Sequence, residues 1–130
     1  MNSQIKHYED KLAYEMDSWD LYDNMQRGER IVVIDARSKE AFTKEHIPNA
    51  LNFPHREMSK ESTEKLDKDT LYICYCDGIG CNASTKGALN LAKLGFRTKE
   101  LIGGLDWWKR DGYETKGEEG RAALGIECGC

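Results

Sequence analysis

Two cysteines, Cys76 and Cys81, stand close together in the segment YCDGIGCNAST, where an apolar run ends and a helix is expected to begin. A thiol becomes a strong nucleophile when its pKa is lowered enough to give the thiolate. A strand-to-helix loop favours this state, because backbone N–H groups and the helix dipole create positive potential at its centre. Gly78 and Gly80 let the backbone bend tightly and approach a bound atom closely. We therefore predict that Cys76 is a nucleophile whose thiolate, or a persulfide or oxyanion bound there, is stabilised by this loop.

The second thiol of the loop, Cys81, is a candidate resolving thiol. The two cysteines share one tight loop, so their Cα atoms could fall in the range that a disulfide requires. Cys81 could then convert a persulfide or a sulfenic acid on Cys76 into a disulfide, which would be a redox role. The alternative is that Cys81 is a loop thiol with no partner.

The remaining cysteines have weaker indications. Cys74 lies within the apolar run and reads as a small buried hydrophobe. Cys128 and Cys130 form a Cys-Gly-Cys terminus that could accept sulfur from Cys76, bind a soft metal or remain uninvolved. Two thiolates are too few for a closed zinc site. We therefore expect no metal site and no cofactor.

The composition is that of an ordinary soluble globular domain. The chain has 130 residues, of which 39% are hydrophobic and 32% charged, and its net charge is −4. Acidic and basic residues are interspersed, so we expect no nucleic-acid partner. No apolar run reaches membrane-spanning length, so we expect no membrane partner.

The cysteine count and the start of the chain indicate the compartment. The opening segment MNSQIKHYED has no hydrophobic stretch behind a basic start, which argues against a signal peptide. The chain has five cysteines, whereas a secreted disulfide framework favours an even number. We therefore expect the reducing cytoplasm, where clustered thiols indicate chemistry or metal binding.

Two uninterrupted apolar runs, RIVVID at 30–35 and TLYICY at 70–75, predict strands that are buried on both faces. Asp17 is the expected N-cap of a helix that ends at Gly28, and STKGALNLAKLGF predicts a helix that stops at Gly95. Alternating strands and helices predict an α/β domain with a mainly parallel sheet and helices on both faces.

Shorter elements are expected between and around these. We predict a helical or loose lead-in with a short strand over the first fifteen or so residues, and a short helical piece followed by a turn at 47–49 in SKEAFTKEHIPNALNFP. We further predict a short strand at 50–52, a polar helix at 55–66, a strand in KELIGG and a last helix in LDWWKRDG. Beyond Tyr113 the sequence reads as a polar tail.

Three blocks of the chain together resemble single-domain rhodaneses, a family of sulfurtransferases. They are VVIDARSKEAF before HIPNALNFP, then YICYC with its loop and helix, and finally LIGGLDWWKRDGY. The match covers about 31–113, so we assign a rhodanese-like domain to 1–113 and a polar tail to 114–130. The resemblance implies a five-stranded sheet, a catalytic cysteine at Cys76 and an active-site loop formed by Asp77, Gly78, Ile79, Gly80, Cys81, Asn82 and Ala83.

The resemblance also implies a reaction. The thiolate would take a sulfane sulfur from a small donor such as thiosulfate and become a persulfide. It would then pass the sulfur to cyanide, to a small thiol or to a protein thiol, which is ping-pong covalent catalysis.

This loop departs from the family pattern in its charge. It is longer than usual, the arginine normally found near its end is absent, and no Arg or Lys lies between Cys76 and Lys86. Asp77 adds a negative charge beside the thiol. A doubly charged donor therefore loses a charge-assisted partner, which argues against thiosulfate:cyanide activity and leaves other donors open.

Two other functions stay open. One is a redox-sensing or persulfide-carrier module that uses a Cys76–Cys81 disulfide. The other is arsenate reductase or phosphatase-like oxyanion chemistry, which related folds with longer loops perform; the missing arginine counts against it.

Asp35 and Arg37 are expected to hold the loop framework, with Arg37 able to supply part of the missing positive potential. His46 is expected to be a structural residue of a turn.

Overall fold

The two apolar runs form neighbouring strands of a five-stranded parallel sheet. This computed structural model describes residues 2–124, and its strand order is β1-β5-β4-β2-β3. The strands are β1 (Glu15–Met16), β2 (Ile31–Asp35), β3 (Leu51–Asn52), β4 (Leu71–Tyr75) and β5 (Arg97–Leu101). Each strand pairs in parallel with its neighbours, and all of β2 pairs with all of β4. The predicted α/β class with a five-stranded sheet is confirmed.

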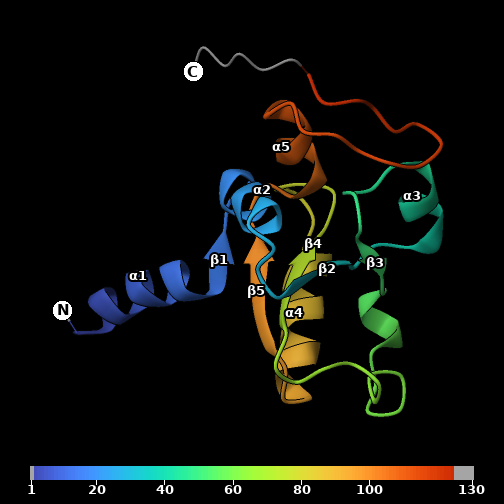
Figure 1. Ribbon diagram of the computed structural model, residues 1–130. Coiled ribbons are helices and arrows are strands. Elements are labelled where there is room, and N and C mark those ends of the chain that lie inside the picture. Colours follow the sequence, from blue (N-terminus) through green and yellow to red (C-terminus); the bar gives the residue numbers. More distant parts are fainter. Residues whose placement is uncertain (1, 125–130) are drawn as a thin grey trace.

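Helices connect the strands and cover the sheet on both faces (Figure 1). They are α1 (Asn2–Tyr14), α2 (Ser18–Gln26), α3 (Lys39–Lys44), the 3₁₀ helix η1 (His55–Glu57), α4 (Ala83–Lys93) and α5 (Gly104–Arg110). Asp17 caps α2 as expected, because its carboxylate accepts the Asp20 N–H at 2.8 Å. No helix within residues 2–124 is long and apolar enough to span a membrane.

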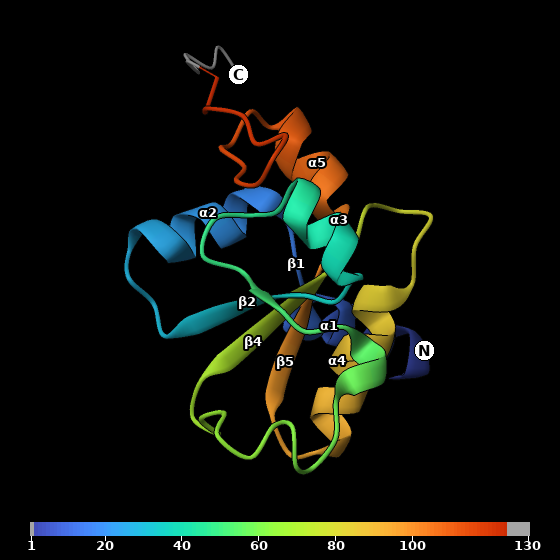
Figure 2. The same ribbon diagram turned by 90° about the vertical axis from the view of Figure 1, so that its right-hand side faces the viewer.

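Alternation along β4 divides the core into two layers. Ile73 and Tyr75 face the cluster that includes Leu21 of α2 and Trp108 of α5. Tyr72 and Cys74 face the opposite cluster, which includes Leu91 of α4. The two layers are visible edge-on in Figure 2, where α2 and α5 lie on the other side of the sheet from α4. Burial on both faces explains why the strand sequence is apolar at every position.

The prediction of a helix over 55–66 is wrong. Only η1 forms there, and turns follow it. The backbone N–H of Ser59 donates to the Ser62 hydroxyl, and the backbone N–H of Ser62 donates to the Ser59 hydroxyl. The Thr63 hydroxyl donates to the Ser59 carbonyl at 2.7 Å. Such local side-chain bonds compete with helix formation, and this segment has no apolar stripe that packing could stabilise.

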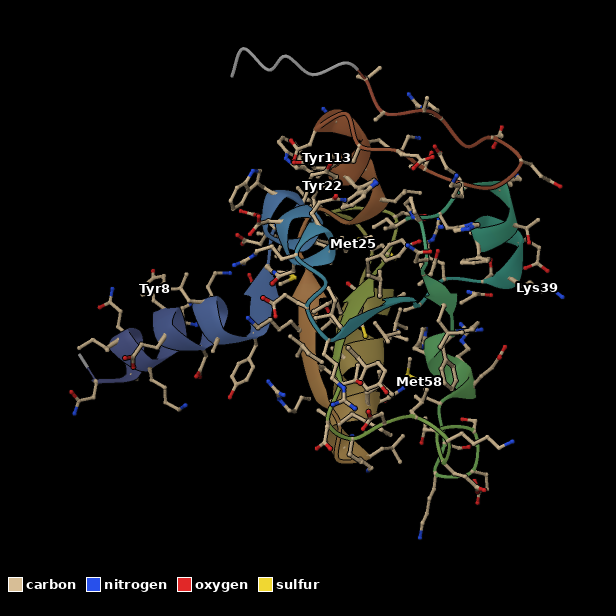
Figure 3. The ribbon with its side chains drawn as sticks, viewed as in Figure 1. Tyr8, Tyr22, Met25, Lys39, Met58 and Tyr113 are labelled. Atoms are coloured by element: carbon tan, nitrogen blue, oxygen red, sulfur yellow. A yellow bond between two sulfur atoms is a disulfide. The ribbon has the colours of Figure 1, made fainter. Side chains whose placement is uncertain are left out.

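Helix α1 extends away from the sheet and has no buried residue (Figure 1). Its apolar side chains Ile5, Tyr8 and Leu12 are exposed, and Tyr8 points into solvent in Figure 3. By contrast, the rings of Tyr22 and Tyr113 stack with their centroids 4.4 Å apart, which ties α2 to the segment after α5 (Figure 3).

The segment after Tyr113 packs on the domain as far as it is described. Lys116 and His46 form an antiparallel bridge, with each N–H donating to the other's carbonyl at 2.9 Å. Thr115 is buried, and its hydroxyl donates to Glu45 at 2.6 Å. These contacts hold residues 114–121 beside the segment that follows α3.

Candidate active site

Cys76 follows β4 directly, at the carboxyl end of a central strand, and is only 2% exposed. In parallel α/β sheets, ligand sites form outside these strand ends. The N-terminus of α5 fixes the backbone here: the N–H of Leu105 donates to the Cys76 carbonyl at 2.9 Å, and that of Asp106 donates to the Asp77 carbonyl at 2.8 Å. The backbone at Cys76 is therefore fixed by β4 on one side and by the first turn of α5 on the other.

The loop brings the second thiol back to the first. The N–H of Cys81 donates to the Gly78 carbonyl at 3.2 Å and closes a turn. Cys76 and Cys81 form a disulfide, with their Cα atoms 6.2 Å apart. This separation lies within the ordinary range for disulfides. The structure thus places the two loop thiols in bonding contact, with Cys76 buried and Cys81 partly exposed.

Most amides of the loop are available to a ligand. Between Asp77 and Asn82, the Cys81 N–H alone has an acceptor among the described residues. The first turn of α4 follows immediately and adds the positive end of a helix dipole. These N–H groups lie in a mostly exposed loop, where water or an anion can accept their hydrogen bonds. The loop is therefore suited to bind an anion, although it contains no basic side chain.

A buried ion pair between Arg37 and Asp35 lies next to the loop. Arg37 donates from Nε and Nη2 to the two carboxylate oxygens of Asp35, at 3.0 and 2.7 Å, and from Nη2 to the Glu45 carbonyl at 2.6 Å. The Tyr75 hydroxyl donates to Asp35 at 2.5 Å and accepts the Ile47 N–H at 3.1 Å. Burial, followed by the charge of Asp35, raises the pKa of Tyr75, so the phenol stays protonated.

Arg37 also reaches the active-site loop. Its Nη1 donates to Asp77 at 2.9 Å, and the Asp77 side chain is 71% exposed. Burial alone would lower the pKa of Arg37, but hydrogen bonds and the charge of Asp35, together with the bond to Asp77, raise it. The carboxylates of Asp35 and Asp77 already neutralise this guanidinium. Arg37 therefore offsets the negative charge of Asp77 but does not supply the free positive charge that an arginine in the loop would give.

Two openings flank Cys76. One, of about 710 Å³, is bordered by Ile79, Glu100 and Ile102. The other, of about 540 Å³, is bordered by Arg37 and Lys39 and, from η1, by residues 55–57. The sulfur atoms can therefore be approached from either side of the loop.

Sequence reasoning missed His55 and Arg56, which line the second opening together with Cys76 and Cys81. Burial and the charges of Lys86 and Arg56 lower the pKa of His55, so the imidazole is neutral at pH 7. No local signal marks these residues, because they reach the site only through the fold.

The donor atoms of Cys76, Asp77 and Cys81 lie within 4.8 Å of one another. Three donors leave a tetrahedral site incomplete, and the disulfide removes both thiolates from the set. The arrangement fits thiol chemistry better than a resident metal.

Cys74 is the free cysteine among the described residues, and it is buried. Burial, with a smaller contribution from Glu100, raises the pKa of its thiol to about 12, which makes the thiol inert at neutral pH.

His46 has a structural environment: its Nδ1 lies 2.7 Å from the Phe42 carbonyl, and its ring stacks on Phe42. Cys128 and Cys130 lie outside the described residues.

Comparison with known proteins identifies the family and the fold. The sequence model of the rhodanese-like domain matches residues 18–111. The chain belongs to this family. A protein of Coxiella burnetii, named thiosulfate sulfurtransferase GlpE, is 35% identical to this chain, and the match covers 84% of this chain and 89% of that protein.

Solved rhodanese-like and related structures share the fold. A crystal structure from Bacillus halodurans is 41% identical, with a TM-score of 0.86, and the match covers 95% of this chain and 90% of that one. A rhodanese-related protein from Thermoplasma volcanium is 26% identical, with a TM-score of 0.68, over 79% of this chain and 97% of its own.

Proposed function

We propose that this rhodanese-like protein is a sulfurtransferase that carries sulfane sulfur as a persulfide on Cys76. The observation that carries the proposal is the placement of Cys76: it is buried at the end of β4, its carbonyl accepts a hydrogen bond from α5, and between Asp77 and Asn82 every backbone N–H except that of Cys81 has no acceptor among the described residues. The name of the Coxiella relative, a thiosulfate sulfurtransferase, supports the same reaction class.

The reaction begins from the reduced loop. The Cys76 thiolate attacks the sulfane sulfur of a donor, the donor's own S–S bond breaks, and the remainder leaves with the electron pair. The loop amides stabilise the persulfide anion that results. An external thiolate, cyanide or a protein thiol then attacks the outer sulfur, and the Cys76 thiolate is released.

The charges at the site favour some donors over others. Asp77 lies next to Cys76, and the nearby guanidinium of Arg37 is paired with Asp35 and Asp77. A dianion such as thiosulfate therefore gains less here than a donor with a single negative charge or none. The same pairing weakens the case for phosphatase or arsenate reductase chemistry, because phosphoryl and arsenate oxygens require such a cation.

The proposal is tested by intact-mass spectrometry. The protein is reduced, desalted and incubated with thiosulfate, inorganic polysulfide or glutathione persulfide. Cys81→Ser, which cannot form the loop disulfide, should gain sulfur that cyanide removes, as should Cys74→Ala/Cys81→Ser, and Cys76→Ser should gain none. A Cys76→Ser protein that acquires as much cyanide-labile sulfur as Cys81→Ser would refute the proposal.

A further inference from the structure

The Cys76–Cys81 disulfide shows which group can reach the sulfur of Cys76. The loop is closed by the turn between Gly78 and Cys81, and the Cα separation of 6.2 Å lets the two Sγ atoms bond. Any sulfur species on Cys76 is therefore formed within reach of Cys81. Cys81 occupies the more exposed position, so its sulfur is the more accessible of the two to solvent and to a co-substrate.

We propose that Cys81 is an internal acceptor that releases the bound sulfur as hydrosulfide, so that the protein acts as a persulfide reductase. This inference rests on the proposed function, since it needs a persulfide on Cys76. In this reaction the sulfur leaves as sulfide, and the co-substrate is a dithiol.

The step balances without an added oxidant. The Cys81 thiolate attacks Cys76 Sγ, the inner sulfur of the persulfide, and the Cys76–Cys81 disulfide forms. The bond between the inner and outer sulfur breaks, and the outer sulfur leaves with the electron pair and takes a proton from water. The sulfane sulfur is reduced to sulfide while the two cysteine sulfurs are oxidised to the disulfide.

The geometry favours this route over attack by a dilute external thiol. An intramolecular thiol in bonding contact has a high effective concentration. The disulfide between Cys76 and Cys81, which is the product of this step, is also the state seen in the structure.

A dithiol then restores the reduced loop. It attacks Cys81, the accessible sulfur, and the Cys76 thiolate leaves into the stabilising loop. A second attack within the dithiol frees Cys81. The opening beside the disulfide, bordered by the exposed Ile79 and Ile102, gives the reductant access. Over one cycle, a sulfane sulfur and a dithiol become hydrosulfide and a disulfide.

A single-turnover experiment tests the inference. Reduced full-length protein is loaded with inorganic polysulfide and desalted without thiol. Sulfide is trapped with monobromobimane while intact mass is followed. Wild type should release one sulfide per persulfide and end as the protein that has lost two hydrogen atoms. Cys81→Ser and Cys81→Ala should take up sulfur and hold it, with release slowed by ~100-fold until dithiothreitol is added.

Two control variants separate Cys81 from the other cysteines. Cys74→Ala and the double variant Cys128→Ser/Cys130→Ser should release sulfide as wild type does. Release from the Cys81 variants at the wild-type rate would overturn the inference while leaving the persulfide proposal intact. The same holds if release requires Cys128 and Cys130. If Cys76 takes up no sulfur in any variant, the proposed function fails and this inference fails with it.

Discussion

The backbone N–H of Leu105 donates to the carbonyl of Cys76 at 2.9 Å, so the first turn of α5 directly holds the residue that follows β4. This contact requires close approach of two backbones. Gly104 has φ +55°, and a Cβ there would lie 2.3 Å from the Cys76 carbonyl oxygen and 2.9 Å from the Gly78 nitrogen. The absence of a side chain at Gly104 therefore determines where Cys76 can sit.

We expect Gly104→Ala to displace the loop and to destabilise the protein by roughly 1–3 kcal/mol, because it adds both a backbone clash and a positive-φ strain. Sulfur loading of Cys76 should fall in parallel. Urea unfolding and intact mass measure the two effects.

Gly28→Ala is the matched control. Gly28 has φ +68° but no atom within 4 Å of the added Cβ, so it reports the conformational strain without the clash. It should cost less stability than Gly104→Ala and leave sulfur loading intact. Equal losses for the two variants would contradict the role of close packing against Cys76.

Arg37 should be among the most costly side chains to remove. Asp35 is fully buried, and Arg37 makes two hydrogen bonds to it at 8% exposure. Arg37→Met leaves that carboxylate unpaired, so we expect a loss of about 3–5 kcal/mol in the free energy of unfolding. Arg37→Lys should cost less but still destabilise, because one ammonium group cannot replace the fork of a guanidinium.

Arg110→Met gives the comparison. Arg110 pairs with Asp106, and both side chains are more than half exposed. Its removal should change stability by about 1 kcal/mol or less. Urea unfolding of the three variants measures the difference, and similar values for Arg37→Met and Arg110→Met would show that the buried pair is not a major source of stability.

The sequence was most informative where one pattern dominates. Uninterrupted apolar runs identify β2 and β4, because burial on both faces demands them, and the end of the second run locates Cys76. The N-cap at Asp17 was also readable, since capping is local. Alternating strands and helices were enough for the α/β class.

The surroundings of the thiol were not readable in the same way. His55 and Arg56 reach Cys76 from η1, and the polar run around them suggests a longer helix that local serine bonds prevent. The Arg37 contact with the Glu45 carbonyl also depends on the folded path of the chain. Such neighbours are set by long-range packing, which residue spacing does not encode.

Asp77 should slow the reaction of reduced Cys76 with anionic reagents. Its carboxylate adjoins the thiol and occupies one N–H of Arg37. Asp77→Asn removes the negative charge and leaves Arg37 less neutralised, so iodoacetate should alkylate Cys76 faster by about fivefold, equivalent to roughly 1 kcal/mol. Neutral iodoacetamide should gain less.

The comparison is made with Asp23→Asn, which removes the carboxylate that pairs with Arg27 at the C-terminal end of α2. That variant should alkylate like wild type. High salt should reduce the advantage of Asp77→Asn, because the charge is exposed. An unchanged ratio of iodoacetate to iodoacetamide rates would show that Asp77 does not affect the charge selectivity of the site.

Glu45 should make the stability of the fold depend on pH in the acid range. Burial alone would raise the pKa of Glu45, but hydrogen bonds from Lys109 and Thr115 outweigh it and lower the pKa from the usual 4.5. A carboxylate with a lowered folded pKa stabilises the protein above its unfolded pKa and loses that contribution as pH falls through the folded value. Urea unfolding at a series of pH values should therefore show a gap between wild type and Glu45→Gln that is widest near neutrality and narrows in acid. Thr115→Val should show a smaller gap of the same sign, and a gap between wild type and Glu45→Gln that is constant with pH would mean that the ionised form of Glu45 contributes nothing to folding.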